Sequence, residues 1–227
     1  MADDKNQAQE QLKSIEENLT KAEMYVEENK NNLMVVVLAI AIGFSGFFAY
    51  DRFYVQPKEE NASTELYMAE KNFELSKFQE ALDGDEQFAG LLEVIDSYGG
   101  TNAANLAEYY AGISYLRLGD ANSAIEHLDK FSSDDEILAP IAKAAIGDAF
   151  SELGQNEEAL SYYIKAAELR TNDFTTPIFL MKAANAAYTL GDKENALLLY
   201  TRIKTEFASS NEGQKVDKYI AKVSASN

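Results

Sequence analysis

Few side chains in this sequence could carry acid–base or metal chemistry. The chain has one histidine, His127, and no cysteine. A lone histidine with no nucleophile or aspartate in register lacks the arranged pair that catalysis needs, so we expect His127 to be an ordinary residue of an amphipathic helix. The absence of cysteine excludes disulfides, Cys-ligated zinc, iron–sulfur clusters and thiol catalysis.

Two acidic segments could suggest ion or phosphate sites. Asp83, Asp85 and Glu86 surround Gly84, but the ligand spacing of a twelve-residue calcium loop is missing. The segment 132–136, Ser-Ser-Asp-Asp-Glu, is typical of a helix N-cap with acids in the first turn. No glycine-rich phosphate loop and no nucleophile elbow is present. We therefore expect no enzyme activity, no cofactor and no metal.

The net charge of the chain restricts the classes of partner that it can bind. The 227 residues include 20 Lys+Arg and 38 Asp+Glu, a formal net charge of −18. Binding to nucleic acid needs clustered basic residues that neutralise phosphates, so a nucleic-acid partner is excluded. An anionic lipid surface is disfavoured for the same reason.

One segment predicts a membrane helix. Residues 33–50 carry no charged side chain. As a helix, this uncharged run is long enough to cover most of a hydrocarbon core of roughly 30 Å. The 32 residues before it are net acidic and no small-x-small cleavage site follows, so a cleaved signal peptide fits poorly. We expect a transmembrane signal-anchor over 33–55, with Tyr50, Phe53 and Tyr54 at the headgroup level.

The first 32 residues predict an acidic helix with a short heptad pattern. Apolar side chains recur at alternating steps of four and three residues, at Ala8, Leu12, Ile15, Leu19, Ala22 and Val26. Two interpretations stay open: a marginal amphipathic helix that continues into the span, or a docking helix, including self-association through residues 8–26. The basic residues that flank the span are Lys13, Lys21 and Lys30 on one side and Arg52 and Lys58 on the other, which favours a cytoplasmic N-terminus.

After the span, three segments of similar sequence repeat. Each has a small residue, then Leu-Gly-Asp or Leu-Gly-Gln, then an alanine followed one turn later by a larger apolar residue. The turn glycines Gly119, Gly154 and Gly191 are 35 and 37 residues apart, close to the 34-residue period of tetratricopeptide repeats. The small residues Gly112, Gly147 and Ala184 should let the second helix of each pair approach the first closely.

The predicted fold class is all-α: an N-terminal helix and a single transmembrane helix, followed by an α-solenoid of tetratricopeptide-like helix pairs. A degenerate copy begins near Met68 and is interrupted at Asp83-Gly84-Asp85, and a capping helix is expected from about Glu212 to Val223. The expected domains are an acidic cytoplasmic helix (1–32), the signal-anchor (33–55), a short polar linker (56–64) and the repeat domain (65–227) with its capping helix. We expect Pro57 to end the membrane helix.

The whole chain resembles the membrane-anchored tetratricopeptide family of the bacterial ancillary SecYEG translocon subunit. The order of segments carries the resemblance, together with local motifs at 104–112, 147–149 and 218–220. The resemblance implies a bacterial inner-membrane protein whose repeats lie in the periplasm, beside translocon subunits and periplasmic chaperones or clients.

The first helices of the pairs should line a concave face that binds protein partners. Counting from the aligned turn glycines, we expect ten residues there, about half of them buried against neighbouring helices: Leu106, Tyr109, Ile113, Asp148, Ser151, Glu152, Ile178, Met181, Asn185 and Tyr188. A clamp for C-terminal carboxylates would need Lys and Asn where Tyr109 and Asp148 stand, so that ligand is disfavoured.

The function we expect is a membrane-tethered periplasmic scaffold that docks proteins at the Sec translocon and assists the handling of translocated proteins. One rival is a scaffold of another envelope machine for secretion, division or outer-membrane biogenesis. The other rival is an enzyme or its dedicated activator subunit.

Overall fold

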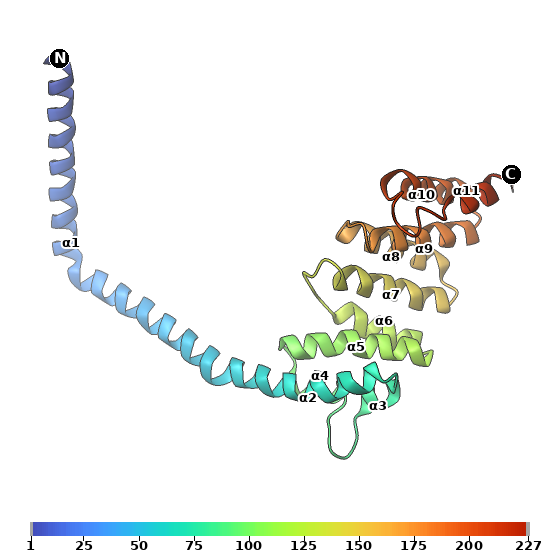
Figure 1. The fold of residues 1–227 in the computed structure, drawn as a ribbon. Helices are drawn as coiled ribbons and strands as arrows, with labels where there is room; N and C mark the ends of the chain where they lie inside the picture. Colours follow the sequence, from blue (N-terminus) through green and yellow to red (C-terminus); the bar gives the residue numbers. More distant parts are fainter. Residues whose placement is uncertain (1, 226–227) are drawn as a thin grey trace. The chain divides into compact units, whose positions relative to one another are not determined.

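The structure is a computed structural model that describes the backbone of residues 2–225 and the side chains of residues 18–21 and 23–225. Its elements are helices, and they follow in this order (Figure 1): α1 Ala2–Tyr50, the π-helical η1 Asp51–Val55, α2 Gln56–Glu74, α3 Phe78–Asp83, α4 Leu91–Tyr98, α5 Asn102–Leu118, α6 Ala121–Lys130, α7 Leu138–Glu152, α8 Asn156–Leu169, α9 Thr176–Thr189, α10 Lys193–Glu206 and α11 Asp217–Ala225. The chain divides into two compact units, Met1–Pro57 and Lys58–Asn227. The all-α solenoid expected from the repeats is confirmed.

The first unit contains the apolar run. One helix of the described residues, within Asn18–Glu74, is long and apolar enough to cross a membrane. The large apolar side chains of the run are exposed along it, among them Met34, Ile42 and Phe47. Tyr50 and Tyr54 stack with their ring centroids 5.2 Å apart.

The segment 56–64 is helical, so the expectation that Pro57 ends the helix was wrong. Pro57 is the second residue of α2 and cannot donate a hydrogen bond to the carbonyl of Phe53, four residues earlier. The turn just before it is π-helical, and the Gln56 amide donates to the Asp51 carbonyl, five residues back. A local π turn is one way in which a helix absorbs the hydrogen bond that a proline removes.

The second unit consists of helix pairs. Contacts join α5 to α6, α7 to α8 and α9 to α10, and α6 to α7 and α8 to α9 between pairs. The first helix of each pair ends at a left-handed glycine, with φ of +83° at Gly119, +73° at Gly154 and +82° at Gly191. The positive φ explains why glycine recurs at the turn.

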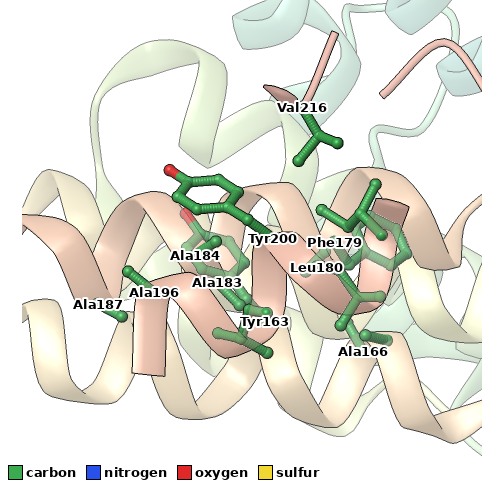
Figure 2. Close-up of a cluster of buried hydrophobic side chains, with 14 of the residues drawn as sticks. Tyr163, Ala166, Phe179, Leu180, Ala183, Ala184, Ala187, Ala196, Tyr200 and Val216 are labelled. Atoms are coloured by element: carbon green, nitrogen blue, oxygen red, sulfur yellow. The ribbon is translucent and has the colours of Figure 1, made fainter. Parts of the chain in front are cut away.

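Small residues set the close crossings inside the pairs, as the repeat pattern predicts. A Cβ added at Gly112 would lie 2.5 Å from Leu128 Cγ, and one added at Gly147 would lie 2.7 Å from Tyr163 Cε1. In the third pair alanine takes this role: Ala183, Ala184 and Ala187 lie with Tyr200 in one buried cluster (Figure 2). These residues belong to the largest core cluster, which includes the buried Val216 and Val223 near the C-terminus.

Side chains also cap the helices. Asp120 accepts a hydrogen bond from the Ser123 amide at the start of α6, and Asp192 accepts one from the Asn195 amide at the start of α10. In the segment 132–136, the Asp135 carboxylate accepts hydrogen bonds from the backbone amides of Ile137 and Leu138. Asp135 therefore binds amides at the start of α7, but the helix begins at Leu138 with no acid in its first turn, so the acids of 132–136 lie before the helix and not within it as expected.

The C-terminal capping helix begins later than expected, at Asp217 instead of Glu212. The chain first turns back on the end of α10, because the Ser210 hydroxyl donates to the Phe207 carbonyl and accepts from the Gly213 amide. A Cβ at Gly213 would lie 2.2 Å from the Phe207 carbonyl oxygen. This tight turn takes residues 208–216 out of the helix.

Candidate functional site: a groove on the repeat domain

A groove of about 610 Å³ lies within the second unit, and residues of α5, α7 and α9 form most of its walls. These are the first helices of the three clear pairs, so the groove lies on the face where the sequence predicts partner binding. α2 and α8 add one residue each. Its lining residues are Phe73, Tyr109, Ile113, Leu116, Arg117, Ile141, Ala144, Ala145, Asp148, Ser151, Glu152, Tyr163, Phe179 and Lys182.

The floor of the groove carries a connected polar cluster. Lys182 Nζ lies 2.5 Å from Asp148 Oδ1 and 2.7 Å from Oδ2, and the Tyr163 hydroxyl donates to Asp148 Oδ1 at 2.7 Å. The same ammonium lies 5.5 Å from the centroid of the Tyr163 ring. Burial, and then the hydrogen bond to Asp148, raise the pKa of the Tyr163 hydroxyl. The cluster holds three helices in register with its charges already paired.

One end of the groove is aromatic. Tyr109 packs with its ring centroid 5.3 Å from that of Phe131 and 5.5 Å from that of Tyr110, and Tyr110 in turn meets Phe73 at 4.9 Å. Burial raises the pKa of the Tyr109 hydroxyl. Tyr109 is half-buried, so one part of its side chain supports the core and the other faces the groove.

The rim carries two opposite charges that are exposed. Arg117 lies in the last turn of α5 and Glu152 ends α7, and neither forms an ion pair among the described residues. Ser151, next to Glu152, is exposed as well. An exposed charge without a partner can pair with a ligand without first breaking an internal bond.

The structure divides the ten residues expected on the concave face. Five of them line this groove: Tyr109, Ile113, Asp148, Ser151 and Glu152. The other five lie elsewhere in the domain: Leu106, Ile178, Met181, Asn185 and Tyr188.

Packing explains where the second five lie. Leu106 packs between two core clusters, and Ile178, Met181 and Tyr188 pack against the C-terminal cluster that contains Val216 and Val223. The Asn185 amide oxygen accepts a hydrogen bond from the Tyr200 hydroxyl at 2.6 Å, and Lys222 Nζ lies 4.7 Å from the Tyr188 ring centroid.

Sequence reasoning missed Lys182, Arg117 and Phe73. A usable signal for Lys182 exists: Lys182 and Asp148 are 34 residues apart, one repeat length, on the first helices of consecutive pairs. Opposite charges at that spacing lie on neighbouring helices of a solenoid and can meet. Phe73 has no such signal, because it comes from the degenerate first copy.

His127 has a partner that the sequence pattern did not reveal. Its Nδ1 lies 2.6 Å from Glu108 Oε2, and both side chains are largely buried between α5 and α6. The imidazole also stacks on Tyr115, with centroids 5.3 Å apart. The pair joins the two helices of the first clear repeat. Among the residues that the structure describes, no three His, Asp or Glu side chains form a group that could hold a metal ion.

Comparison with known proteins indicates the type of repeat and the fold. Residues 106–134 match the family model described as tetratricopeptide repeat. The helical domain is a tetratricopeptide-like repeat solenoid. A crystal structure of nearly identical TPR-like repeats, described as a kinesin light chain of Podosopora anserina, superposes with a TM-score of 0.53 at 14% identity.

That match covers 70% of this chain and 83% of the other, and at this identity it concerns the fold alone. No curated protein shows significant sequence similarity to this chain. Tetratricopeptide-like solenoids are extended surfaces suited to binding proteins, so the groove is the candidate interaction site of this one.

Proposed function

We propose that this protein is a membrane-tethered scaffold whose repeat solenoid binds protein partners in the periplasm. It is held in the bacterial inner membrane by α1 and stands at the Sec translocon, among translocon subunits, periplasmic chaperones and translocated clients. It performs no chemistry of its own.

The observation that supports this most is the groove itself. Its floor is preorganised, because Asp148 is already bonded to Lys182 and Tyr163. Its rim offers unpaired charges at Arg117 and Glu152, and its aromatic end offers contact area that can be desolvated. This combination suits an extended or helical peptide segment better than a small polar metabolite.

The membrane placement rests on the apolar run of α1 and on the sequence around it. The run is long enough to cross a bilayer. The basic residues that flank it number three before it (Lys13, Lys21 and Lys30) and two after it (Arg52 and Lys58). Ser224 is exposed near the end of α11. A Cys placed there should react with a membrane-impermeant thiol reagent in intact spheroplasts, and labelling only after lysis would refute the periplasmic orientation.

Photo-crosslinking in intact membranes tests the scaffold function. A photoreactive residue at the exposed Ser151 in the groove should give adducts with translocon subunits or their clients, identified by mass spectrometry. The matched control is the exposed Glu157 at the start of α8, which does not line the groove. Adducts of another envelope machine would replace the translocon with that machine, and equal adducts from both positions would remove the groove from consideration.

A further inference from the structure

The heptad pattern of the N-terminal segment does not stop at the predicted membrane boundary. Helix α1 is unbroken from Ala2 to Tyr50, and the alternating steps of three and four residues run on through the span. The α1 seam is defined here as the described part of this register: Leu19, Val26, Asn29, Leu33, Val36, Ile40, Gly43 and Phe47. One helix face thus carries the same register on both sides of the boundary.

The part of the α1 seam before the apolar run lacks an apolar environment. Leu19 is 57% exposed and Val26 is 54% exposed, and neither belongs to the apolar stretch that lipid would cover. Large apolar side chains at heptad spacing outside a membrane favour burial against another helix.

The charge pattern beside the α1 seam fits a second copy of the chain. Copies inserted in the same direction can associate only in parallel, and a parallel pair brings each g position next to an e position of the partner. The g positions are neutral: Gln11, Asn18, Tyr25 and Asn32. The acids Glu16 and Glu23 occupy e positions, so in this register they never face another acid.

Asn29 is the polar residue of the α1 seam. It occupies a core heptad position just before the apolar run, and its Nδ2 donates to the Tyr25 carbonyl at 2.9 Å, which leaves its Oδ1 to accept a bond from a partner. A polar side chain in an otherwise apolar seam favours the alignment in which it meets a polar partner, because burial without a hydrogen bond is costly.

Within the apolar run, the α1 seam contains one small residue, Gly43. A Cβ added at Gly43 would meet nothing within 4 Å, and Ala39 and Gly46 lie next to it on the g side. In lipid, helices associate where small residues let their backbones approach. The register and the small residues therefore meet on one face.

We propose that α1 pairs in parallel with α1 of a second copy along the α1 seam, from Leu19 through Gly43 to Phe47. The proposal uses the membrane placement given above and is independent of what the groove binds. It predicts that two repeat domains are tethered side by side, which would raise the effective concentration of grooves for a client that reaches both.

The absence of native cysteine makes a disulfide scan direct. Single Cys residues at Val26 and Asn29 lie in the α1 seam, and single Cys residues at Glu28 and Asn31 lie on the opposite face. Full-length variants in isolated membranes are oxidised with copper phenanthroline and separated without reductant. We expect disulfide-linked homodimers from Val26→Cys and Asn29→Cys, at about tenfold the yield of the two controls, as a fixed register requires.

Equal yields at all four positions, monomer throughout, or adducts with a different protein would each overturn the proposal. A second pair of variants, added to Val26→Cys, tests the span. Gly43→Ile should lower the homodimer yield about tenfold, while Ala41→Ile, which adds the same side chain off the α1 seam, should leave it unchanged. Equal effects of the two substitutions would contradict the proposed face.

Discussion

Lys182 on α9 bonds both carboxylate oxygens of Asp148 on α7, at 2.5 and 2.7 Å, across the floor of the groove. Tyr163 on α8 donates to the same carboxylate. Three helices from two consecutive pairs therefore share one acceptor group. Because the solenoid is held together by contacts between neighbouring repeats, this cluster ties two consecutive pairs to each other inside the groove.

Loss of the lysine tests how much this cluster stabilises the domain. Lys182→Met keeps the length of the side chain but leaves Asp148 with only Tyr163 as partner. We expect the free energy of unfolding to fall by about 1 kcal/mol, which lowers the Tm by about 2–4 °C in a domain of this size. Lys204→Met is the control, because it removes an exposed ion pair to Asp217. Equal shifts in thermal unfolding would mean that the floor pair is worth no more than a surface pair.

Gly147 tests the close crossing of α7 and α8. The Cβ of Gly147→Ala would come within 2.7 and 2.8 Å of two atoms of the Tyr163 ring, so the ring must move and its bond to Asp148 must stretch. We expect a loss of about 1–3 kcal/mol in urea unfolding. Gly99→Ala should change nothing measurable, since its nearest neighbour is the Ile95 carbonyl oxygen at 3.5 Å. An unchanged midpoint for Gly147→Ala would show that the crossing is looser than described.

The repeat architecture could be predicted from sequence because its determinants are local. A glycine at a left-handed turn and a small residue at a crossing leave a visible pattern, and Gly119, Gly154 and Gly191 occupy those turns as expected. The helical course of 56–64 could not be predicted from the proline rule. That rule treats Pro57 as a helix end, whereas the π turn before it lets the helix continue.

The groove could be predicted only in part. Tyr109 and Asp148 line the groove because both follow the repeat register of α5 and α7. Met181 and Tyr188 of α9 do not line it, because they pack against the core cluster that α10 and α11 complete. The Glu108–His127 pair was invisible because its partners are 19 residues apart on different helices.

Glu59 decides where a stable soluble fragment must begin. Its two carboxylate oxygens accept from the Asn102 and Ala103 amides at the start of α5, at 2.8 and 2.9 Å. A fragment that starts at Asn61 removes this cap, and we expect it to unfold with about 1–2 kcal/mol less stability than one that starts at Lys58. In the longer fragment, Glu59→Ala should reproduce the loss in thermal melts and Glu60→Ala, at an exposed site, should not. Equal stability of the two fragments would contradict the cap.

Tyr200 should make the free energy of unfolding fall as the pH becomes alkaline. Burial raises the pKa of its hydroxyl to about 12, with further contributions from Tyr219 and Tyr188. The folded state therefore favours the neutral phenol, and this stabilisation is complete below the ordinary tyrosine pKa of about 10 and is lost as the pH rises towards about 12. Urea unfolding between about pH 9 and about pH 11 should show the free energy of unfolding falling more steeply in the parent than in Tyr200→Phe. The exposed Tyr67→Phe should retain the parent's slope, and identical slopes in all three proteins would refute the assignment.

The groove rim gives the cleanest test of function, because its charges can be changed without disturbing the core. Arg117 and Glu152 are exposed and form no ion pair among the described residues. Arg117→Glu and Glu152→Arg should therefore each change the free energy of unfolding by less than about 0.5 kcal/mol.

If a partner segment lies in the groove, reversal of either rim charge should lower capture about fivefold or more, because a like charge then faces the ligand. The yield of adducts from a photoreactive residue at Ser151 measures this in intact membranes. Glu157→Arg introduces the same charge change on α8 outside the groove and should leave the yield unaltered. A normal adduct yield from one folded rim variant would exclude recognition of that charge. Normal yields from both variants would move the search for the docking surface to α1.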